Sequence, residues 1–413
     1  MTETQNAPTP PVLAPPASPA SPASSAPAGP TVPAAASTGV APAAPAGPAG
    51  PADPAVTRER RFAARRGATR LLTGPRPQTM RELLAELAEG EGLDQAPDFY
   101  GDGIVAALEQ RVAGLLGKPA AVFFPTGTMA QQVALRHWAT RTGTVALHPL
   151  AHPELHEGRA YARLSGLTAL WPTTEPRLPS AAELHAVAEL FDAILLELPL
   201  REAGFVLPSW DELTATVAAA RERGAAVHFD GARLWESARH LGHSLPEIAA
   251  LADSVYVSFY KTLGGFSGAA LAGDEEFAAS ARLWRHRYGG KLFQQWPTVL
   301  SALAGLDREL PLLDSYLDHA PLVARALAAT PGSRVHPELP HTHQFQYWLP
   351  YPADRLNQAN LRLAEEQGLS LFNLWLPSPL PGLSMTEITV CGPALEWTEE
   401  QIRDAMTRFL ALL

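Results

Sequence analysis

Two residues of chemical interest, Asp230 and Lys261, each follow a short apolar run. Residues 225–229 are predicted to form a buried strand that ends at Asp230, and residues 254–260 a second strand that ends at Lys261. In an open α/β sheet, ligands bind beyond the carboxyl ends of the strands. The acid and the lysine are therefore candidates for a ligand site, and the alternative is that both are ordinary polar residues that end a strand.

A lysine at a strand end can act as an amine nucleophile and form a Schiff base with a carbonyl. The cofactor that calls for this pair is pyridoxal 5'-phosphate (PLP), which needs a lysine for its aldehyde and an acid for its pyridinium nitrogen. The acid keeps the ring nitrogen protonated, so that the ring can draw in electrons from a carbanion at Cα. The pair therefore predicts a PLP site at Lys261 and Asp230.

The stretch around this pair resembles the threonine aldolase / β-eliminating lyase family, a group of PLP enzymes with the aspartate aminotransferase-like type I fold. The resemblance rests on Asp-Gly-Ala-Arg at 230–233 and on Leu-Gly-Gly at 263–265 after Lys261. It extends from about residue 70 to the C-terminus and is most specific in the middle of the chain. It implies that Arg233 meets the substrate carboxylate or nearby cofactor oxygens, anions that a guanidinium fork fits.

A phosphate site is predicted at Thr126-Gly127-Thr128, between a strand at residues 121–125 and a helix. Backbone N–H groups at a helix N-terminus attract anions, and Thr128 adds a hydroxyl. The same three residues would also make an ordinary helix cap. The family carries Ser/Thr-Gly-Thr at this place, so the resemblance implies that Gly127 and Thr128 hold the PLP phosphate.

Three more candidates depend on the resemblance. The match of residues 151–158 to the family's Ala-His stretch selects His152, with His156 as the fallback, for cofactor stacking and proton transfer. Histidine suits general-base work because its pKa is near neutrality. Tyr100 lies in a loop that resembles Asp-x-Tyr-Gly and is expected to approach the substrate. Lys291 follows two glycines and is expected to reach the phosphate of a neighbouring subunit, unless it is a solvated loop lysine.

The chain departs from the family at two informative places. Tyr260 stands before the lysine where serine is common, so Ser258 or Thr262 would have to supply one phosphate contact. The C-terminal arginine that grips the substrate carboxylate is absent from residues 385–390. Either Arg233 handles the carboxylate alone, another arginine substitutes, or the substrate differs from a plain α-amino acid.

The expected fold is α/β, of the type I PLP-dependent transferase kind. Strands alternate with helices along the middle of the chain, which indicates a mostly parallel sheet covered on both faces. Glu197 lies at the end of one of these strands. The 413 residues suffice for a large core and a smaller domain. The expected division is a disordered Ala/Pro-rich tail (1–56), a large PLP-binding domain (57–300) and a small C-terminal α+β domain (301–413).

Composition narrows the class of protein. The tail is expected to be disordered because it has no charged residue between Glu3 and Asp53 and little apolar surface to bury. The net charge of −10 argues against a general nucleic-acid binder, and no apolar run approaches the roughly 18 residues of a membrane span. The lone Cys391 rules out an intrachain disulfide and fits a cytoplasmic protein. His341 and His343 lack a third ligand, so no metal is expected.

The predicted function is a PLP-dependent aldolase that cleaves β-hydroxy-α-amino acids, of the L-threonine or L-allo-threonine type, to glycine and an aldehyde. His152, or a water it positions, would take the β-hydroxyl proton. The alternatives are a β-eliminating lyase or side-chain exchange enzyme, and, more remotely, a retired scaffold that binds partners through its tail. The family implies a small amino acid as substrate and a homodimer or homotetramer.

Overall fold

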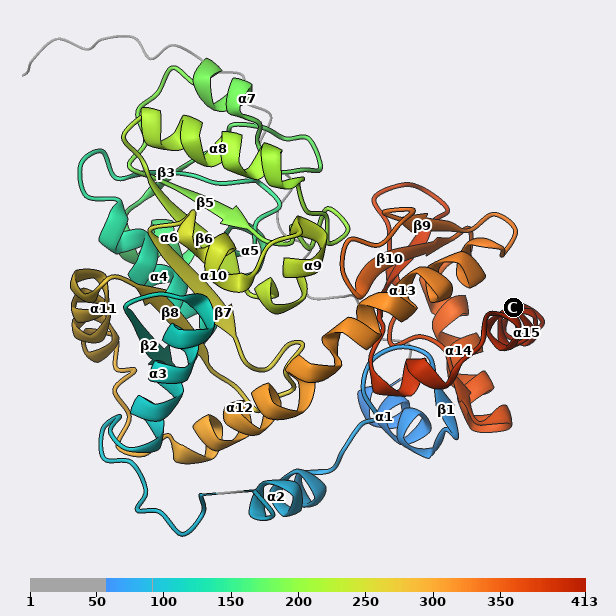
Figure 1. Ribbon diagram of the computed structural model, residues 1–413. Helices are drawn as coiled ribbons and strands as arrows, with labels where there is room; N and C mark the ends of the chain where they lie inside the picture. Colours follow the sequence, from blue (N-terminus) through green and yellow to red (C-terminus); the bar gives the residue numbers. More distant parts are fainter. Residues whose placement is uncertain (1–56, 91) are drawn as a thin grey trace, which may run out of the picture. The chain divides into compact units, whose positions relative to one another are not determined.

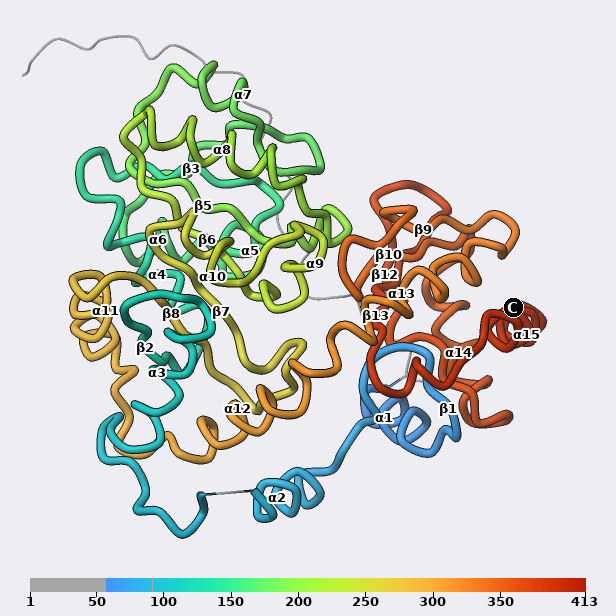
Figure 2. Tube along the Cα trace, viewed as in Figure 1, coloured from blue at the N-terminus to red at the C-terminus, as the bar shows by residue number. Residues whose placement is uncertain are grey.

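The computed structural model describes residues 57–90 and 92–413, shown as a ribbon in Figure 1 and as a tube in Figure 2. The tail of residues 1–56, expected to be disordered, lies outside the described residues. The central sheet has seven strands in the order β2-β8-β7-β6-β5-β3-β4. These are β2 (Ala120–Phe124), β3 (Thr144–Ala146), β4 (Thr168–Leu170), β5 (Ala193–Glu197), β6 (Ala226–Gly231), β7 (Ser254–Ser258) and β8 (Ala269–Gly273).

The sheet is mostly parallel, as the sequence predicts. Only β8 runs antiparallel to its neighbours β2 and β7, and the other four pairings are parallel. The strands that carry the candidate residues, β5, β6 and β7, lie side by side in the middle of the sheet. Their carboxyl ends therefore meet at one edge, where ligands of such sheets bind.

Helices cover both faces of this sheet. The helices of this part are α3 (Ile104–Leu116), α4 (Gly127–Trp138), α5 (His152–Leu155), α6 (Ala160–Ser165), α7 (Ala181–Ala186), α8 (Trp210–Glu222), α9 (Ala238–Leu241), α10 (Leu245–Ala250) and α11 (Glu275–Arg287). Alternation along β2 explains the two layers, because Val122 and Phe124 pack in a cluster with α4 and α11, whereas Phe123 packs in the cluster that contains α3.

The C-terminal part contains a second, antiparallel sheet with the strand order β12-β13-β10-β9. Its strands are β9 (Arg334–His336), β10 (Gln344–Leu349), β12 (Leu376–Pro377) and β13 (Ser384–Thr389), and its helices are α12 (Trp296–Glu309), α13 (Leu313–Ala328), α14 (Ala353–Gln367) and α15 (Glu399–Leu410). Helices and strands thus mix here, as expected for an α+β unit. Across the two described ranges, no helix combines the length and the apolar character needed to cross a membrane.

The start of the described chain packs against this C-terminal part. The elements concerned are α1 (Arg58–Gly67), β1 (Arg70–Leu71), α2 (Met80–Ala88) and β11 (Leu369–Ser370). Strand β1 pairs in parallel with β11. The buried guanidinium of Arg65 donates to the carbonyls of Phe372 and Thr73 at 3.1 and 2.8 Å. The domain boundaries at residues 57 and 300 remain predictions, and these contacts favour a small domain that draws on both ends of the described chain.

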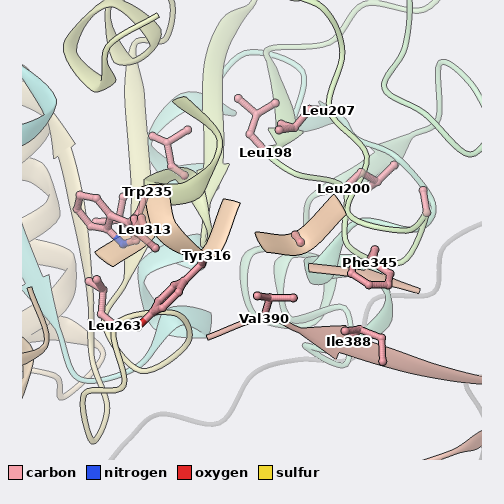
Figure 3. Close-up of a cluster of buried hydrophobic side chains, with 14 of the residues drawn as sticks. Leu198, Leu200, Leu207, Trp235, Leu263, Leu313, Tyr316, Phe345, Ile388 and Val390 are labelled. Carbon is pink, nitrogen blue, oxygen red and sulfur yellow. The ribbon is translucent and has the colours of Figure 1, made fainter. Parts of the chain in front are cut away.

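One apolar cluster continues from the central sheet to the C-terminal sheet, and Figure 3 shows part of it. Its buried members include Leu198 after β5, Leu263 in the loop that carries Lys261, and Val390 after β13. Burial of such side chains is the main favourable contribution to folding. The loops at the carboxyl edge of the large sheet therefore pack on the same apolar core as β13.

Candidate active site

Three buried side chains form a row at the carboxyl edge of the central sheet. Glu197 of β5 is the register partner of Asp230 in β6, and Asp230 is the partner of Tyr256 in β7. Neighbouring strands lie about 4.8 Å apart, so the row is compact. The Asp230 carboxylate accepts from the Ala232 N–H at 3.1 Å, which fixes its orientation.

Lys261 stands in the loop between β7 and β8, because the strand predicted to reach residue 260 ends at Ser258. Two backbone bonds fold the loop back on itself, from the Gly265 N–H to the Phe259 carbonyl at 2.8 Å and from the Gly264 N–H to the Lys261 carbonyl at 3.3 Å. Gly264 has a φ of +68°, which glycine adopts without strain. The turn therefore holds the half-buried Lys261 within electrostatic range of Asp230 and Glu197.

The electrostatics of the site favour a reactive amine. Burial, followed by the positive charge of Arg233, lowers the pKa of Lys261 to about 8, although the Asp230 carboxylate acts in the opposite direction. A lysine with a depressed pKa is neutral more often, and only the neutral amine can attack an aldehyde. Burial and the charge of Asp230 raise the pKa of Glu197, because a second negative charge at this edge is harder to form beside the first.

His152 begins α5 and is held by two carboxylates. Its backbone N–H donates to Glu197 at 2.8 Å, and its Nδ1 lies 3.1 Å from Glu157 Oε1. Burial lowers the pKa of His152, but the bond to Glu157 and the charge of Asp230 more than offset this and raise it overall. Because a carboxylate accepts at Nδ1, the lone pair of the neutral ring is at Nε2. His156, the fallback, bonds to Glu202 instead.

The N-terminus of α4 lies next to the same row. Thr126 caps the helix by accepting from the Met129 N–H at 3.3 Å. A Cβ atom on Gly127 would lie 2.2 Å from the Tyr256 hydroxyl, so only glycine fits here. Thr128 follows in the first turn and is half-buried. The predicted phosphate-binding turn thus adjoins the strand position next to Asp230.

Arg233 carries a guanidinium without a full set of partners. Its side chain lies over the Phe205 ring, 5.2 Å from the centroid, and its buried Nε has no hydrogen-bond partner among the described residues. Burial lowers the pKa of Arg233 despite the opposing charge of Glu236. An unpaired donor of this kind suits an incoming anion.

Tyr100 and Lys291 lie together, and Lys291 directly follows Gly290, which lies against Met129 in the first turn of α4. The Lys291 ammonium is 5.6 Å from the Tyr100 ring centroid, and the ring makes edge contacts with Phe99 and Phe293. Tyr100 is 43% exposed and Phe293 is 55% exposed, which leaves the aromatic cluster open to solvent. Within residues 57–90 and 92–413, no hydrogen bond, ion pair or ring contact joins this pair to Lys261.

The structure shows what the hydroxyls of Ser258 and Thr262 contact. These residues are the two candidates for the phosphate contact that the family's serine makes. The Ser258 hydroxyl donates to the Ala232 carbonyl at 2.9 Å, and the Thr262 hydroxyl donates to Glu236 at 2.7 Å. Both hydroxyls are hydrogen-bonded inside the protein, and a phosphate contact by either residue stays a prediction.

The sequence reasoning also missed residues that shape the site. Glu197 accepts from the His152 N–H and is the register partner of Asp230, and only its strand-end position in the sequence pointed to such a role. Arg201, in the loop after β5, pairs with Glu387 of β13 at 2.8 Å. No spacing in the sequence links those two positions.

The residues present fit PLP. A half-buried amine with a depressed pKa, a buried carboxylate beside it and a helix N-terminus that opens with glycine provide the groups that the aldehyde, the protonated ring nitrogen and the phosphate require. Lys261 would hold the aldehyde carbon, Asp230 the ring nitrogen, and the first turn of α4 the phosphate.

Comparison with known proteins gives the same answer. The model of the beta-eliminating lyase family matches residues 73–347. A solved structure from Listeria monocytogenes EGD-E, provisionally named an L-allo-threonine aldolase, is 32% identical and superposes with a TM-score of 0.80 over 86% of this chain and 99% of that chain.

Two curated relatives match a shorter region. Aldolase vrtJ of Penicillium aethiopicum is 33% identical over 244 residues, which cover 57% of this chain and 62% of the relative. The low specificity L-threonine aldolase of Escherichia coli (strain K12) is 32% identical over 237 residues, 56% of this chain and 71% of the relative. The family match, the type I fold and the strand-end lysine and acid agree, and the chain belongs to the beta-eliminating lyase family of PLP-dependent lyases.

Proposed function

We propose that the protein is a PLP-dependent aldolase that cleaves β-hydroxy-α-amino acids, of the L-threonine or L-allo-threonine type, to glycine and an aldehyde. The observation that carries this proposal is the placement of His152 beside Asp230 and Lys261, with Nδ1 on Glu157 and Nε2 left as a base. The names of the Listeria and Escherichia coli relatives point to the same substrate class.

The proposed roles follow from the geometry. Bound PLP supplies an electron sink for the carbanion left at Cα when the Cα–Cβ bond breaks. His152 accepts the β-hydroxyl proton at Nε2, and Glu157 stabilises the resulting imidazolium through Nδ1. Asp230 holds a proton at the ring nitrogen, and Arg233 binds an anionic oxygen of the substrate or the cofactor. Fixed positions of this kind contribute much of an enzyme's rate.

We also propose a homodimer or homotetramer whose site is completed across a subunit boundary. The exposed cluster of Phe99, Tyr100 and Phe293 supports this, because contiguous exposed apolar surface commonly marks a protein contact. Tyr100 and Lys291 would then serve the substrate and the phosphate of the neighbouring subunit. A cytoplasmic location is proposed from the lone, half-buried Cys391.

The proposal is tested by product analysis. The PLP-loaded protein is incubated with L-threonine, with L-allo-threonine and with L-serine, and glycine, aldehyde, 2-oxobutyrate, pyruvate and ammonia are quantified. We expect glycine and an aldehyde in equal amounts from the β-hydroxy amino acids with a substituted β-carbon. Ammonia with 2-oxobutyrate from the threonine isomers, or with pyruvate from L-serine, as the main products would instead establish β-elimination, the second candidate, which the missing C-terminal arginine keeps open.

Two lysine variants make this test specific. Lys261→Ala should abolish product formation. Lys118→Met is the matched control, because Lys118 is also half-buried with a pKa lowered by burial but bonds to the Ala252 carbonyl, away from the site. Equal loss in both variants, or unchanged product from Lys261→Ala, would contradict the proposal.

A further inference from the structure

The backbone of Arg201 is held beside Glu197 at the edge of the site. Its N–H lies 3.3 Å from the Glu197 carboxylate that also holds His152, and its carbonyl accepts from the N–H groups of Gly204 and Phe205. The loop closes where Leu200 and Val206 bridge each other. These backbone contacts fix the position of the Arg201 Cα atom beside Glu197.

The Arg201 guanidinium has donors that its two ion pairs leave unused. Its two Nη atoms lie 2.8 Å from Glu202 and 2.8 Å from Glu387, whereas its buried Nε has no partner among the described residues. A guanidinium has more N–H groups than these two contacts use. The side chain is 27% exposed, so a ligand can still reach it.

Arg201 and Arg233 act on the same small region. The positive charge of Arg201 lowers the pKa of both Lys261 and Arg233, which means that the three cations lie within electrostatic range of one another. Both guanidinium Nε atoms are buried and unpaired in the described part of the chain. Carboxylates, Glu197 and Glu387 among them, lie in the same region and offset part of this positive charge. The two unpaired buried donors suit a further anion, because such donors are otherwise costly.

Glu387 explains how Arg201 is kept in place. It belongs to β13, the stretch in which the family's carboxylate-binding arginine was expected and is missing. Leu200 and Ile388, the neighbours of Arg201 and Glu387, belong to the same apolar cluster (Figure 3). The ion pair thus joins two backbones that a common core already holds.

We propose that Arg201 and Arg233 together bind the α-carboxylate of the amino acid substrate, with Arg201 taking the place of the missing C-terminal arginine. This inference rests on the proposed function in so far as the ligand is an α-amino acid. One carboxylate oxygen meets each guanidinium, and Glu387 orients Arg201 from the opposite side. Only substrates with a free α-carboxylate then bind well.

The test compares glycine with glycinamide, which lacks the negative charge, in calorimetric titrations of the PLP-loaded protein. Wild-type protein should prefer glycine. Arg201→Met should weaken glycine binding by about 10- to 100-fold, the range for a lost charge-assisted hydrogen bond. Glycinamide binding should change little, so that the preference collapses. Arg201→Lys, which keeps the charge but loses the fork, should give an intermediate preference.

Two further variants separate carboxylate binding from a structural role. Glu387→Gln keeps a hydrogen-bond acceptor, so the preference for glycine should persist or increase. Arg177→Met removes an arginine that is bonded to Glu183 at 2.8 and 2.9 Å and is not near Lys261, and it should leave both affinities unchanged. The inference is overturned if Arg201→Met retains the preference for glycine, or if it and Glu387→Gln weaken both ligands alike.

The two proposals fail separately. A protein that binds glycine through Arg201 but releases no aldehyde from any β-hydroxy amino acid would retain this inference and overturn the proposed function. A protein that releases aldehyde while its preference for glycine is independent of Arg201 would do the reverse.

Discussion

At the scale of single residues, the chemistry depends on the protonation of Lys261. With a pKa of about 8, roughly one amine in ten is neutral at pH 7, against fewer than about one in a thousand for an ordinary lysine. Only the neutral amine attacks the aldehyde, so capture of PLP by the cofactor-free protein should speed up about tenfold from pH 7 to a plateau above pH 9. The rate is followed through the absorption band at roughly 420 nm that marks lysine-bound PLP.

The variant Arg233→Met tests the cause of this shift. Removing a neighbouring positive charge makes protonation of Lys261 easier, so its pKa should rise and the midpoint of the rate profile should move to higher pH. Arg177→Met, which removes a distant arginine, should leave the midpoint in place. A wild-type midpoint near that of a free lysine, or a shift to lower pH in Arg233→Met, would contradict the assigned electrostatics.

At the scale of elements, the contact between α4 and β7 positions the phosphate-binding turn. Gly127→Ala would place a methyl group 2.2 Å from the Tyr256 hydroxyl and 3.1 Å from its ring carbon. Overpacking of this kind costs about 1–3 kcal/mol and should displace the helix N-terminus. We expect both a lower melting temperature and weaker PLP binding, measured by thermal unfolding and by spectral titration with PLP.

A second substitution in the same contact provides the control. Tyr256→Phe removes the nearer clashing atom, so Gly127→Ala with Tyr256→Phe should regain part of the lost stability and PLP affinity. Gly114→Ala tests glycine replacement itself, because a Cβ at Gly114 in α3 meets nothing within 4 Å and should be tolerated. A double variant no better than Gly127→Ala alone would show that the clash is not the cause.

The same element shows how far sequence reasoning reaches. The strand, the small-residue turn and the helix around Gly127 are local features, and periodicity together with capping rules predicts them. The reason that residue 127 must be glycine is not local. It depends on the register that brings Tyr256 beside Asp230, and register is set by pairing between strands far apart in the chain.

For the molecule as a whole, the type I fold and most of the group around Lys261 could be predicted, because strand-end residues of neighbouring parallel strands converge. Interactions between residues far apart in the sequence could not be predicted. The pairing of Arg201 with Glu387 and the insertion of Arg65 beneath β11 involve side chains whose partners no pattern in the sequence specifies. The approach of Lys291 to the Tyr100 ring is a further example.

The role proposed for Lys291 at a neighbouring subunit leads to a prediction about assembly. If Lys291 serves the site of a neighbouring subunit, Lys261→Ala and Lys291→Ala chains should complement each other in a mixed dimer. One of its two symmetric sites would then contain both native lysines, and aldolase activity should reach about half that of the wild type.

Differently tagged chains are co-expressed, the mixed dimer is purified through both tags, and aldehyde release is compared with each parent. Pairing Lys261→Ala with His152→Ala is the matched control, because both residues belong to the group within one chain and no complete site can form. A mixed Lys261→Ala and Lys291→Ala dimer that is no more active than its parents would place Lys291 outside the partner's site.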